Sequence, residues 1–147
     1  MKLSLFILAA AVVALLAYIR LAPSDPERWH IDPTAAADPG PGGVLIPPRR
    51  YTLNISPRAL IEKFDTIALQ HPATMRLAGT VDGNHITYMV RSKWFGFPDY
   101  VTVKTIPTDT GGSTLAILSR LRFGQSDLGV NRARLDNWLA QLKMPPG

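Results

Sequence analysis

Two segments of this sequence hold more charged and aromatic side chains than folding alone requires. The first is RSKWFGFPDY, residues 91–100, and the second is SRLRFGQSDLGVN, residues 119–131. Each joins the end of a predicted strand to aromatic residues, a glycine and an acid. In a meander their arginines would end parallel strands and lie near one rim of the sheet. The candidate ligand-binding residues of the two segments are Arg91, Trp94, Asp99, Arg120, Arg122, Ser126, Asp127 and Asn131.

The second segment has the composition of an anion cradle. The backbone N–H groups of residues 128–130 are predicted to open a helix, whose positive end would face Arg120 and Arg122. Ser126 would add a hydroxyl group, so a carboxylate or a phosphate would fit. A structural role accounts for the same residues and is the preferred interpretation. In it, Asp127 caps the helix and pairs with one of these arginines, which fixes the helix to the sheet.

Two other features of these segments are also interpreted structurally. Asn131 lies close to the centre of the apolar stripe of the predicted helix, and a buried amide must form hydrogen bonds. We expect the loop at residues 123–125 to provide the partner. The aromatic residues Trp94, Phe95 and Phe97 are interpreted as anchors in the core or the loop, and an exposed binding platform is the alternative.

The sequence carries no common catalytic signature. It has no nucleophile elbow, no phosphate-binding glycine loop and no H-E-x-x-H motif. Cysteine is absent, which excludes disulfides, a thiolate zinc site and a lipid-modified cysteine. We therefore predict no cofactor and no metal site. The remaining catalytic alternatives are His85 approaching Ser126 and Asp127 in space, and acid–base chemistry by Arg91, Asp99 and Asp127.

The N-terminus begins with an uncharged apolar segment, residues 3–19, between Lys2 and Arg20. As a helix it would be about 25 Å long, the lower limit for a bilayer core of about 30 Å. Arg20 can extend its charged end to the interface, so the next apolar residues lengthen the span. We predict an uncleaved single-pass anchor over residues 1–21.

A cleaved secretory signal is the main alternative to this anchor, and a buried core helix is another. Signal cleavage requires small residues one and three positions before the cut. A cut after Ala17 places Leu15 at the third position, and a cut after Ala22 places Arg20 there. Both sites are poor. The short N-terminal tail favours an orientation with the C-terminal domain outside the membrane. In a bacterium this is the periplasmic side of the inner membrane.

Residues 22–50 are predicted to be a linker. They contain seven of the chain's thirteen prolines, which interrupt helices and sheet ladders alike. Within this stretch we expect Trp29 and Ile31 to dock onto the domain or the membrane interface. A metal-binding role for His30 is disfavoured, because the other two histidines lie at no ligand spacing from it.

Residues 51–143 carry the pattern of one α+β domain, and residues 144–147 are a predicted tail. The predicted strands are 51–55, 74–81, 85–92, 100–106 and 114–122. Ser56-Pro57 is a helix-start signal before a helix to about residue 69, and a second helix begins near Ser126-Asp127. The fold class is therefore an antiparallel sheet of about five strands, with two helices mainly on one face. The predicted buried stripes of the helices are Leu60, Ile61, Phe64, Ile67 and Ala68, then Leu128, Leu135, Trp138, Leu139 and Leu142.

The patterns RSKWFGFPDYVTV and SRLRFGQSDLGVNRARLDNWL resemble a bacterial envelope family, the domain-of-unknown-function family 1499. The resemblance covers about residues 51–142, and SDLGVNRAR is its most specific part. It implies a small secreted, lipid-anchored or membrane-anchored protein, in agreement with the N-terminus. It implies no activity and no catalytic residues.

These observations favour a non-enzymatic envelope domain, held in the membrane by its N-terminal helix, that binds a partner protein or an anionic envelope ligand. The alternative is a hydrolase or transferase acting on cell-envelope material. The formal net charge is +5, of which Lys2 and Arg20 contribute two units. Because the remaining excess is ordinary for a folded domain, we predict no nucleic-acid partner.

Overall fold

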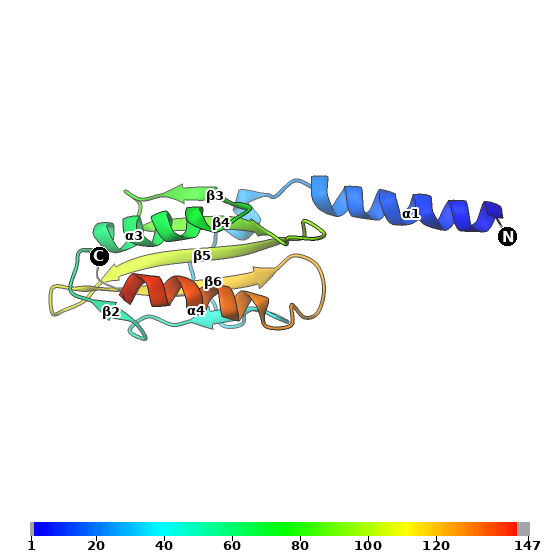
Figure 1. The fold of residues 1–147 in the computed structure, drawn as a ribbon. Coiled ribbons are helices and arrows are strands. Elements are labelled where there is room, and N and C mark those ends of the chain that lie inside the picture. Colours follow the sequence, from blue (N-terminus) through cyan, green and yellow to red (C-terminus); the bar gives the residue numbers. More distant parts are fainter. Residues whose placement is uncertain (1, 144–147) are drawn as a thin grey trace.

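The computed structural model describes residues 2–143 of the chain, and the predicted tail lies outside them. Figure 1 shows a sheet with two long helices in front of it and a separate helix projecting from one end. The elements are α1 (Lys2–Leu21), α2 (Pro26–Trp29), β1 (Val44–Ile46), β2 (Thr52–Leu53), α3 (Pro57–Gln70), β3 (Thr74–Thr80), β4 (His85–Arg91), β5 (Pro98–Pro107), β6 (Ser113–Leu121) and α4 (Val130–Lys143).

The described strands form one antiparallel sheet in the order β1-β6-β5-β4-β3, and β2 also pairs with β6. From β3 to β6 the sheet is a meander, as predicted. The long ladder between β5 and β6 runs from Asp99 opposite Leu121 to Pro107 opposite Ser113. This register makes the start of β5 and the end of β6 one end of the sheet, next to α1 (Figure 1).

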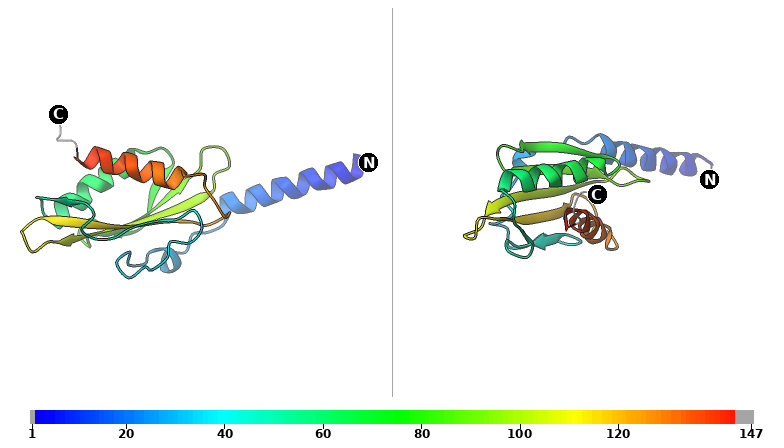
Figure 2. Two further views of the ribbon diagram at one scale, coloured as in Figure 1. Left: turned by 90° about the horizontal axis from the view of Figure 1, so that it is seen from below. Right: turned by 60° about the vertical axis from the view of Figure 1, so that its left-hand side comes forward.

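The two faces of the sheet are covered differently. Helices α3 and α4 cover one face, here called the helix face, as the fold prediction required. The other face carries the N-terminal segment, residues 22–34, and is here called the segment face (Figure 2, left). Because side chains alternate along a strand, β4, β5 and β6 each contribute residues to both layers.

The main core lies between the sheet and the two helices. Ser56 accepts the Ala59 N–H at 3.2 Å and caps α3, with Pro57 as its first residue. The predicted stripes are buried there with two exceptions: Ile67 is only partly buried, and Leu128 is exposed. Alternate strand residues such as Ile86, Val103 and Ile117 complete this layer.

Four local predictions differ from the structure. The predicted linker contains two elements, α2 and β1, and β1 adds a sixth strand to the sheet. The predicted strand 51–55 is reduced to Thr52–Leu53, because only these residues pair with β6. Helix α4 begins at Val130 rather than near residue 126. Leu128 precedes it in a left-handed conformation, φ 54°, which turns its side chain out of the helical stripe.

Helix α1 is the one helix in the described residues that is long and apolar enough to cross a membrane. Its residues are mostly exposed, with Ile19 as the buried exception. This excludes a buried core helix. Length and composition fit an anchor and a signal sequence equally well.

Candidate functional site

The structure brings the three predicted arginines to one rim of the sheet. Arg91 pairs with Pro98 at the start of β5, and the end of β6 lies beside the same strand end. Arg120 pairs with Tyr100, whose ring contributes to the segment face. Arg120 and Arg122 therefore project from the face opposite α3 and α4.

Arg120 and Arg122 bind the backbone of the N-terminal segment. Arg120 donates to the Trp29 carbonyl at 2.9 Å, and its guanidinium lies 4.8 Å from the centroid of the Trp29 ring. Arg122 donates to the Pro23 carbonyl at 2.9 Å and the Ala22 carbonyl at 3.3 Å. Hydrogen bonds from a charged donor are among the stronger ones in proteins. We call this pair of residues the arginine clamp.

Trp29 occupies the centre of the clamp. Its side chain is 6% exposed and stacks on Tyr100 with 3.9 Å between ring centroids and 16° between planes. Met89 and Leu77 complete this second, smaller core. The Tyr100 hydroxyl also bonds to Ser24 at 2.6 Å. Docking of Trp29 onto the domain, one of the two predicted possibilities, is thus what the structure shows.

A chain of hydroxyl groups continues this contact along the segment face. Thr102 donates to the Trp29 carbonyl at 3.2 Å, and its oxygen lies 2.8 Å from the Thr87 hydroxyl. His30 Nδ1 lies 2.8 Å from the same Thr87 oxygen. Because the Thr102 proton is directed at the carbonyl, Thr87 donates to Thr102 and His30 donates to Thr87.

Two histidines stack at this point. The rings of His30 and His85 lie 3.9 Å apart, and His85 Nε2 donates to the Ile31 carbonyl at 3.3 Å. Burial lowers the pKa of both histidines. The second ring and Lys104 lower the pKa of His85 further, whereas the Ile31 carbonyl and Asp32 raise it.

We expect the N-terminal segment to dock less tightly as the pH falls below about 6.5. A histidine with a lowered pKa in the docked state binds protons more weakly there than in the released state. The docking free energy is therefore complete above the ordinary histidine pKa and decreases as the pH falls through it. Hydrogen exchange of the full chain in detergent, corrected for intrinsic rates, should show residues 22–34 losing protection between about pH 7 and about pH 5.

Two variants isolate this effect. His85→Gln keeps an N–H donor for the Ile31 carbonyl but does not titrate, so it should reduce the pH dependence to the part that His30 contributes. His71→Asn is the matched control, because His71 packs against Trp138 on the helix face. If the protection of residues 22–34 kept its full pH dependence in His85→Gln and lost it in His71→Asn, the assignment of this pH dependence to the stacked histidines would be contradicted.

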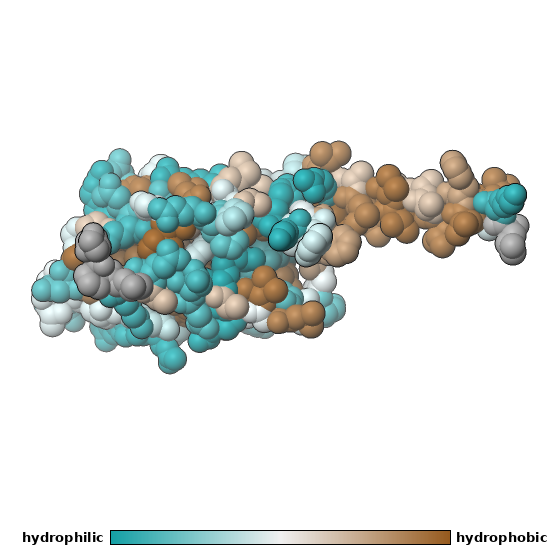
Figure 3. All heavy atoms as spheres, viewed as in Figure 1, coloured by the Kyte–Doolittle hydropathy of each residue, from teal (hydrophilic) through white to brown (hydrophobic). Residues whose placement is uncertain are grey.

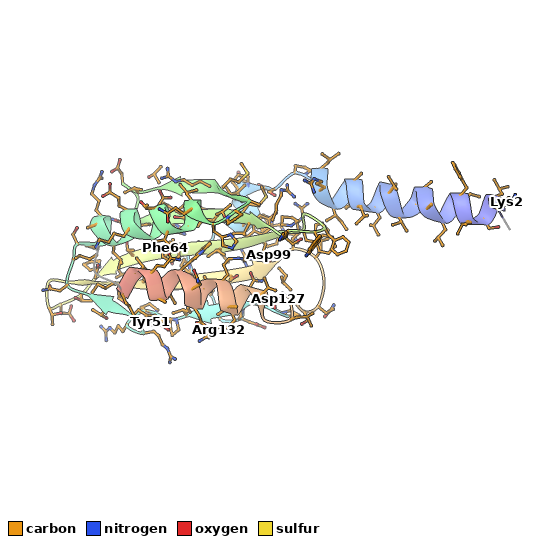
Figure 4. All side chains as sticks on the ribbon, in the orientation of Figure 1. Lys2, Tyr51, Phe64, Asp99, Asp127 and Arg132 are labelled. Atoms are coloured by element: carbon orange, nitrogen blue, oxygen red, sulfur yellow. The ribbon has the colours of Figure 1, made fainter. Side chains whose placement is uncertain are left out.

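The acidic residues of the predicted site lie on the helix face instead. Asp99 is buried at the start of β5, and its carboxylate lies 3.6 Å from Arg134 of α4. Figure 4 shows Asp99 and Asp127 in the half of the domain nearer α1. Burial raises the pKa of Asp99 to about 6, and the charge of Arg134 offsets part of that rise.

Asn131 is fully buried beside this pair, as predicted, but its partner differs from the predicted loop. Its side-chain oxygen accepts from Arg134 at 2.5 Å. Its amide nitrogen has no hydrogen-bond partner in the described residues, nor have Arg134 Nε and Ser119 Oγ. Arg134 is the site residue that the sequence reading missed, although its position three residues after Asn131 places both on one side of a helix.

Asp127 and Ser126 stabilise the loop before α4. Asp127 accepts the N–H groups of Gly129 at 3.0 Å and Asn131 at 2.5 Å, which is the kind of contact that the capping interpretation expects. Ser126 accepts the Leu128 N–H at 3.2 Å. The predicted ion pair between Asp127 and a clamp arginine is absent from the described residues. The anion cradle is not assembled, because the arginines lie on the other face of the sheet.

The loop of the first segment is built around Arg91 and glycine. Arg91 donates to the Gly96 carbonyl at 2.8 Å, and Ser92 accepts the Phe97 N–H at 3.0 Å. Phe97 is partly buried and anchors the loop, as predicted. Trp94 and Phe95 are exposed, so their interpretation as anchors was wrong.

The predicted catalytic combination is not brought together. His85 begins β4 at the end of the sheet far from α1, whereas Ser126 follows the other end of β6. In the described residues no group of three or more His, Asp or Glu side chains is placed to hold a metal ion.

An open groove of about 410 Å³ lies at the end of the sheet far from α1. Its lining includes Arg49 and Lys104, together with Thr34, Thr108 and Thr114. Lys104 is ion-paired with Asp32, and Asp109 is the acid of the lining. The Arg49 guanidinium is exposed and forms no ion pair within the described part of the chain.

Fold and site together define a class of protein: a small α+β domain with an N-terminal segment clamped to its sheet, following a helix able to cross a membrane. The chain belongs to the family described as "Protein of unknown function (DUF1499)", whose model matches residues 21–142. The match begins before the N-terminal segment, about 30 residues earlier than the resemblance noted in the sequence. A comparison with curated proteins gives no match.

Proposed function

We propose that this chain is a non-enzymatic, membrane-anchored binding domain of the bacterial cell envelope. Helix α1 remains attached as a single-pass anchor, and the domain lies on the periplasmic side. The arginine clamp is the observation that carries this proposal. It attaches the residues directly after α1 to the sheet, so the domain is held at the membrane surface rather than on a free linker.

The hydrogen bonds of the clamp arginines support a ligand site elsewhere on the domain. Arg120 and Arg122 are engaged by backbone carbonyls, and Asp99 is paired with Arg134, which supports structural roles for them. The groove at the far end is open, and its Arg49 guanidinium forms no ion pair with any residue that the structure describes. We propose that it takes an anionic group, carried by an envelope ligand or by a partner protein. Catalysis by a hydrolase or transferase receives no support from the separation of His85 and Ser126.

An NMR titration tests the groove. Inorganic phosphate and glycerol 3-phosphate are added separately to the full chain in lipid nanodiscs, while the signals of Thr114 and the Arg49 side chain are followed. We expect saturable shifts at these residues and a loss of affinity of about tenfold in Arg49→Gln, since a charged hydrogen bond contributes about 1.5–3 kcal/mol.

Lys63→Gln is the matched control, because it removes the same charge from an exposed position on α3. Equal shifts in Arg49→Gln and the unmodified chain would show that the groove does not recognise the anion. A response to glycerol 3-phosphate alone would point to a lipid headgroup as the source of the phosphate.

A further inference from the structure

The end of the domain next to α1 carries two loops with exposed apolar side chains. One loop, residues 92–97, joins β4 to β5, and the other, residues 122–129, joins β6 to α4. Trp94 is 82% exposed, Phe95 is 56% exposed and Leu128 is 95% exposed. Figure 3 shows hydrophobic side chains along α1 and on the adjoining end of the domain.

The two loops form one surface because aromatic rings connect them. Phe95 stacks on Phe97 with 5.6 Å between the ring centroids. The centroid of the Phe97 ring lies 6.4 Å from that of Phe123 in the other loop. Exposed large apolar side chains are costly in water, and contiguous ones commonly mark an interaction surface. Phe97 and Phe123, which join the loops, are partly buried, whereas Trp94, Phe95 and Leu128 are exposed.

The position of this surface is fixed by the end of α1. The Arg20 guanidinium lies directly against Gly96, where a Cβ atom would come within 2.9 Å of Arg20 Nη1. Arg122, in the second loop, donates to the carbonyl of Ala22, the residue after α1. Both loops are therefore attached to the point at which α1 ends.

The length of α1 determines how far the two loops lie from a bilayer that α1 crosses. Its 20 residues span about 30 Å, which matches the thickness of a bilayer core. When α1 crosses a membrane, its C-terminal end lies at the interface. The loops bound to that end must then lie at the interface as well.

The side chains of this surface suit a phospholipid interface. Tryptophan is enriched at the headgroup level of membranes, because its ring is apolar and its N–H is polar. Lys93 lies over the Trp94 ring at 5.4 Å, and Arg122 lies over the Phe123 ring at 5.2 Å. Cations beside apolar side chains favour a surface that contains anionic lipids.

We propose that these loops form a lipid-facing platform. Trp94, Phe95 and Leu128 insert into the interfacial layer of the bilayer that α1 spans, and Lys93 faces anionic headgroups. The platform rests on the membrane anchoring in the proposed function, and it is independent of the groove. It gives the domain a second attachment to the membrane and thereby one orientation on it.

Depth-dependent quenching tests the platform. The chain contains no cysteine, so Leu128→Cys and Phe95→Cys each provide one site for an environment-sensitive nitrobenzoxadiazole label. The labelled full chain is placed in vesicles of zwitterionic and anionic phospholipids that include a headgroup-proximal doxyl lipid. Thr110→Cys, in the turn between β5 and β6 at the far end, is the control. We expect quenching at positions 95 and 128 to exceed that at position 110 by about twofold or more.

A second variant tests the side chains themselves. Trp94→Ala with Phe95→Ala should lower quenching at position 128 towards the level of position 110. Met75→Ala removes a comparably exposed apolar side chain from β3 and should leave quenching unchanged.

Vesicle flotation separates the two proposals. A chain that floats with the vesicles but shows equal quenching at all three positions overturns the platform and leaves the anchor intact. A chain that does not float overturns the anchor, and the platform with it.

Discussion

Replacing Trp29 by alanine is expected to release the N-terminal segment from the sheet, with a loss of about 3–5 kcal/mol in its docking free energy. Trp29 is almost completely buried, stacks on Tyr100 and lies under the Arg120 guanidinium. Alanine removes the buried ring together with its contacts to Tyr100 and Arg120. The three carbonyl acceptors of the clamp, those of Ala22, Pro23 and residue 29, remain in the backbone but lose the anchor that holds the segment in register.

Limited trypsin digestion in detergent measures this release. Arg28 precedes Trp29 within the short helix α2, and a protease must extend the backbone around the bond it cuts. A loss of about 3 kcal/mol corresponds to about a 100-fold rise in cleavage after Arg28, because each 1.4 kcal/mol changes the open population tenfold. Cleavage there separates α1 from the rest of the domain, which gives a second readout.

Trp94→Ala is the matched control, since Trp94 is mostly exposed and contributes little to folding. Unchanged cleavage after Arg28 in Trp29→Ala would show that the segment is held by the arginine clamp alone. In that case Arg120→Gln combined with Arg122→Gln should release it.

Replacing Asp99 by alanine should lower the free energy of unfolding by about 3–5 kcal/mol, because it leaves the buried Arg134 guanidinium without its counter-ion. Arginine cannot become neutral under ordinary conditions. Among the residues that the structure describes, Arg134 would retain only its hydrogen bond to Asn131. The reverse change, Arg134→Met, should cost less, since Asp99 can take up a proton and lose its charge.

The pH dependence distinguishes the two partners. The pKa of Asp99 is raised from 3.8 to about 6 by burial, so the folded state binds this proton more strongly than the unfolded state. The contribution of Asp99 to the free energy of unfolding is therefore fully present below its ordinary pKa, and it is lost as the pH rises through about 6. Arg134→Met removes the positive charge that keeps the pKa of Asp99 from rising further. In this variant the stability lost with increasing pH should therefore be larger, and the loss should extend to higher pH.

Chemical unfolding of the full chain in detergent, followed by circular dichroism from about pH 4 to about pH 8, measures both effects. Arg132→Met is the control for Arg134→Met, because Arg132 forms an exposed ion pair with Asp136 and contributes little. Equal losses of unfolding free energy in Asp99→Ala and Arg132→Met would contradict the claim that the buried pair of Asp99 and Arg134 stabilises the fold.

Local sequence signals predicted the scaffold well. Ser56-Pro57 specified the start of α3, and the spacing of its apolar residues identified the face that is buried. The predicted strands 74–81, 85–92, 100–106 and 114–122 correspond to β3, β4, β5 and β6. These features depend on neighbours within a few residues, so the sequence contains their causes.

The predicted site was less accurate because its partners are distant in sequence. Arg120 and Arg122 bind carbonyl groups more than 90 positions away. A backbone carbonyl has the same chemistry at every residue, so no side-chain pattern marks it as an acceptor. The left-handed conformation of Leu128 likewise follows from the capped loop before α4, not from its side chain.

By itself, the sequence determined the apolar N-terminal helix, the order of the principal strands and helices, and the rim at which the three arginines lie. The tertiary structure decided which face each strand residue occupies, and so separated the arginines from Asp99, Asp127 and Asn131. It also showed that a proline-rich stretch packs on the sheet. The physical reason is that alternation along a strand fixes two faces, but only the packing of distant segments decides what covers each one.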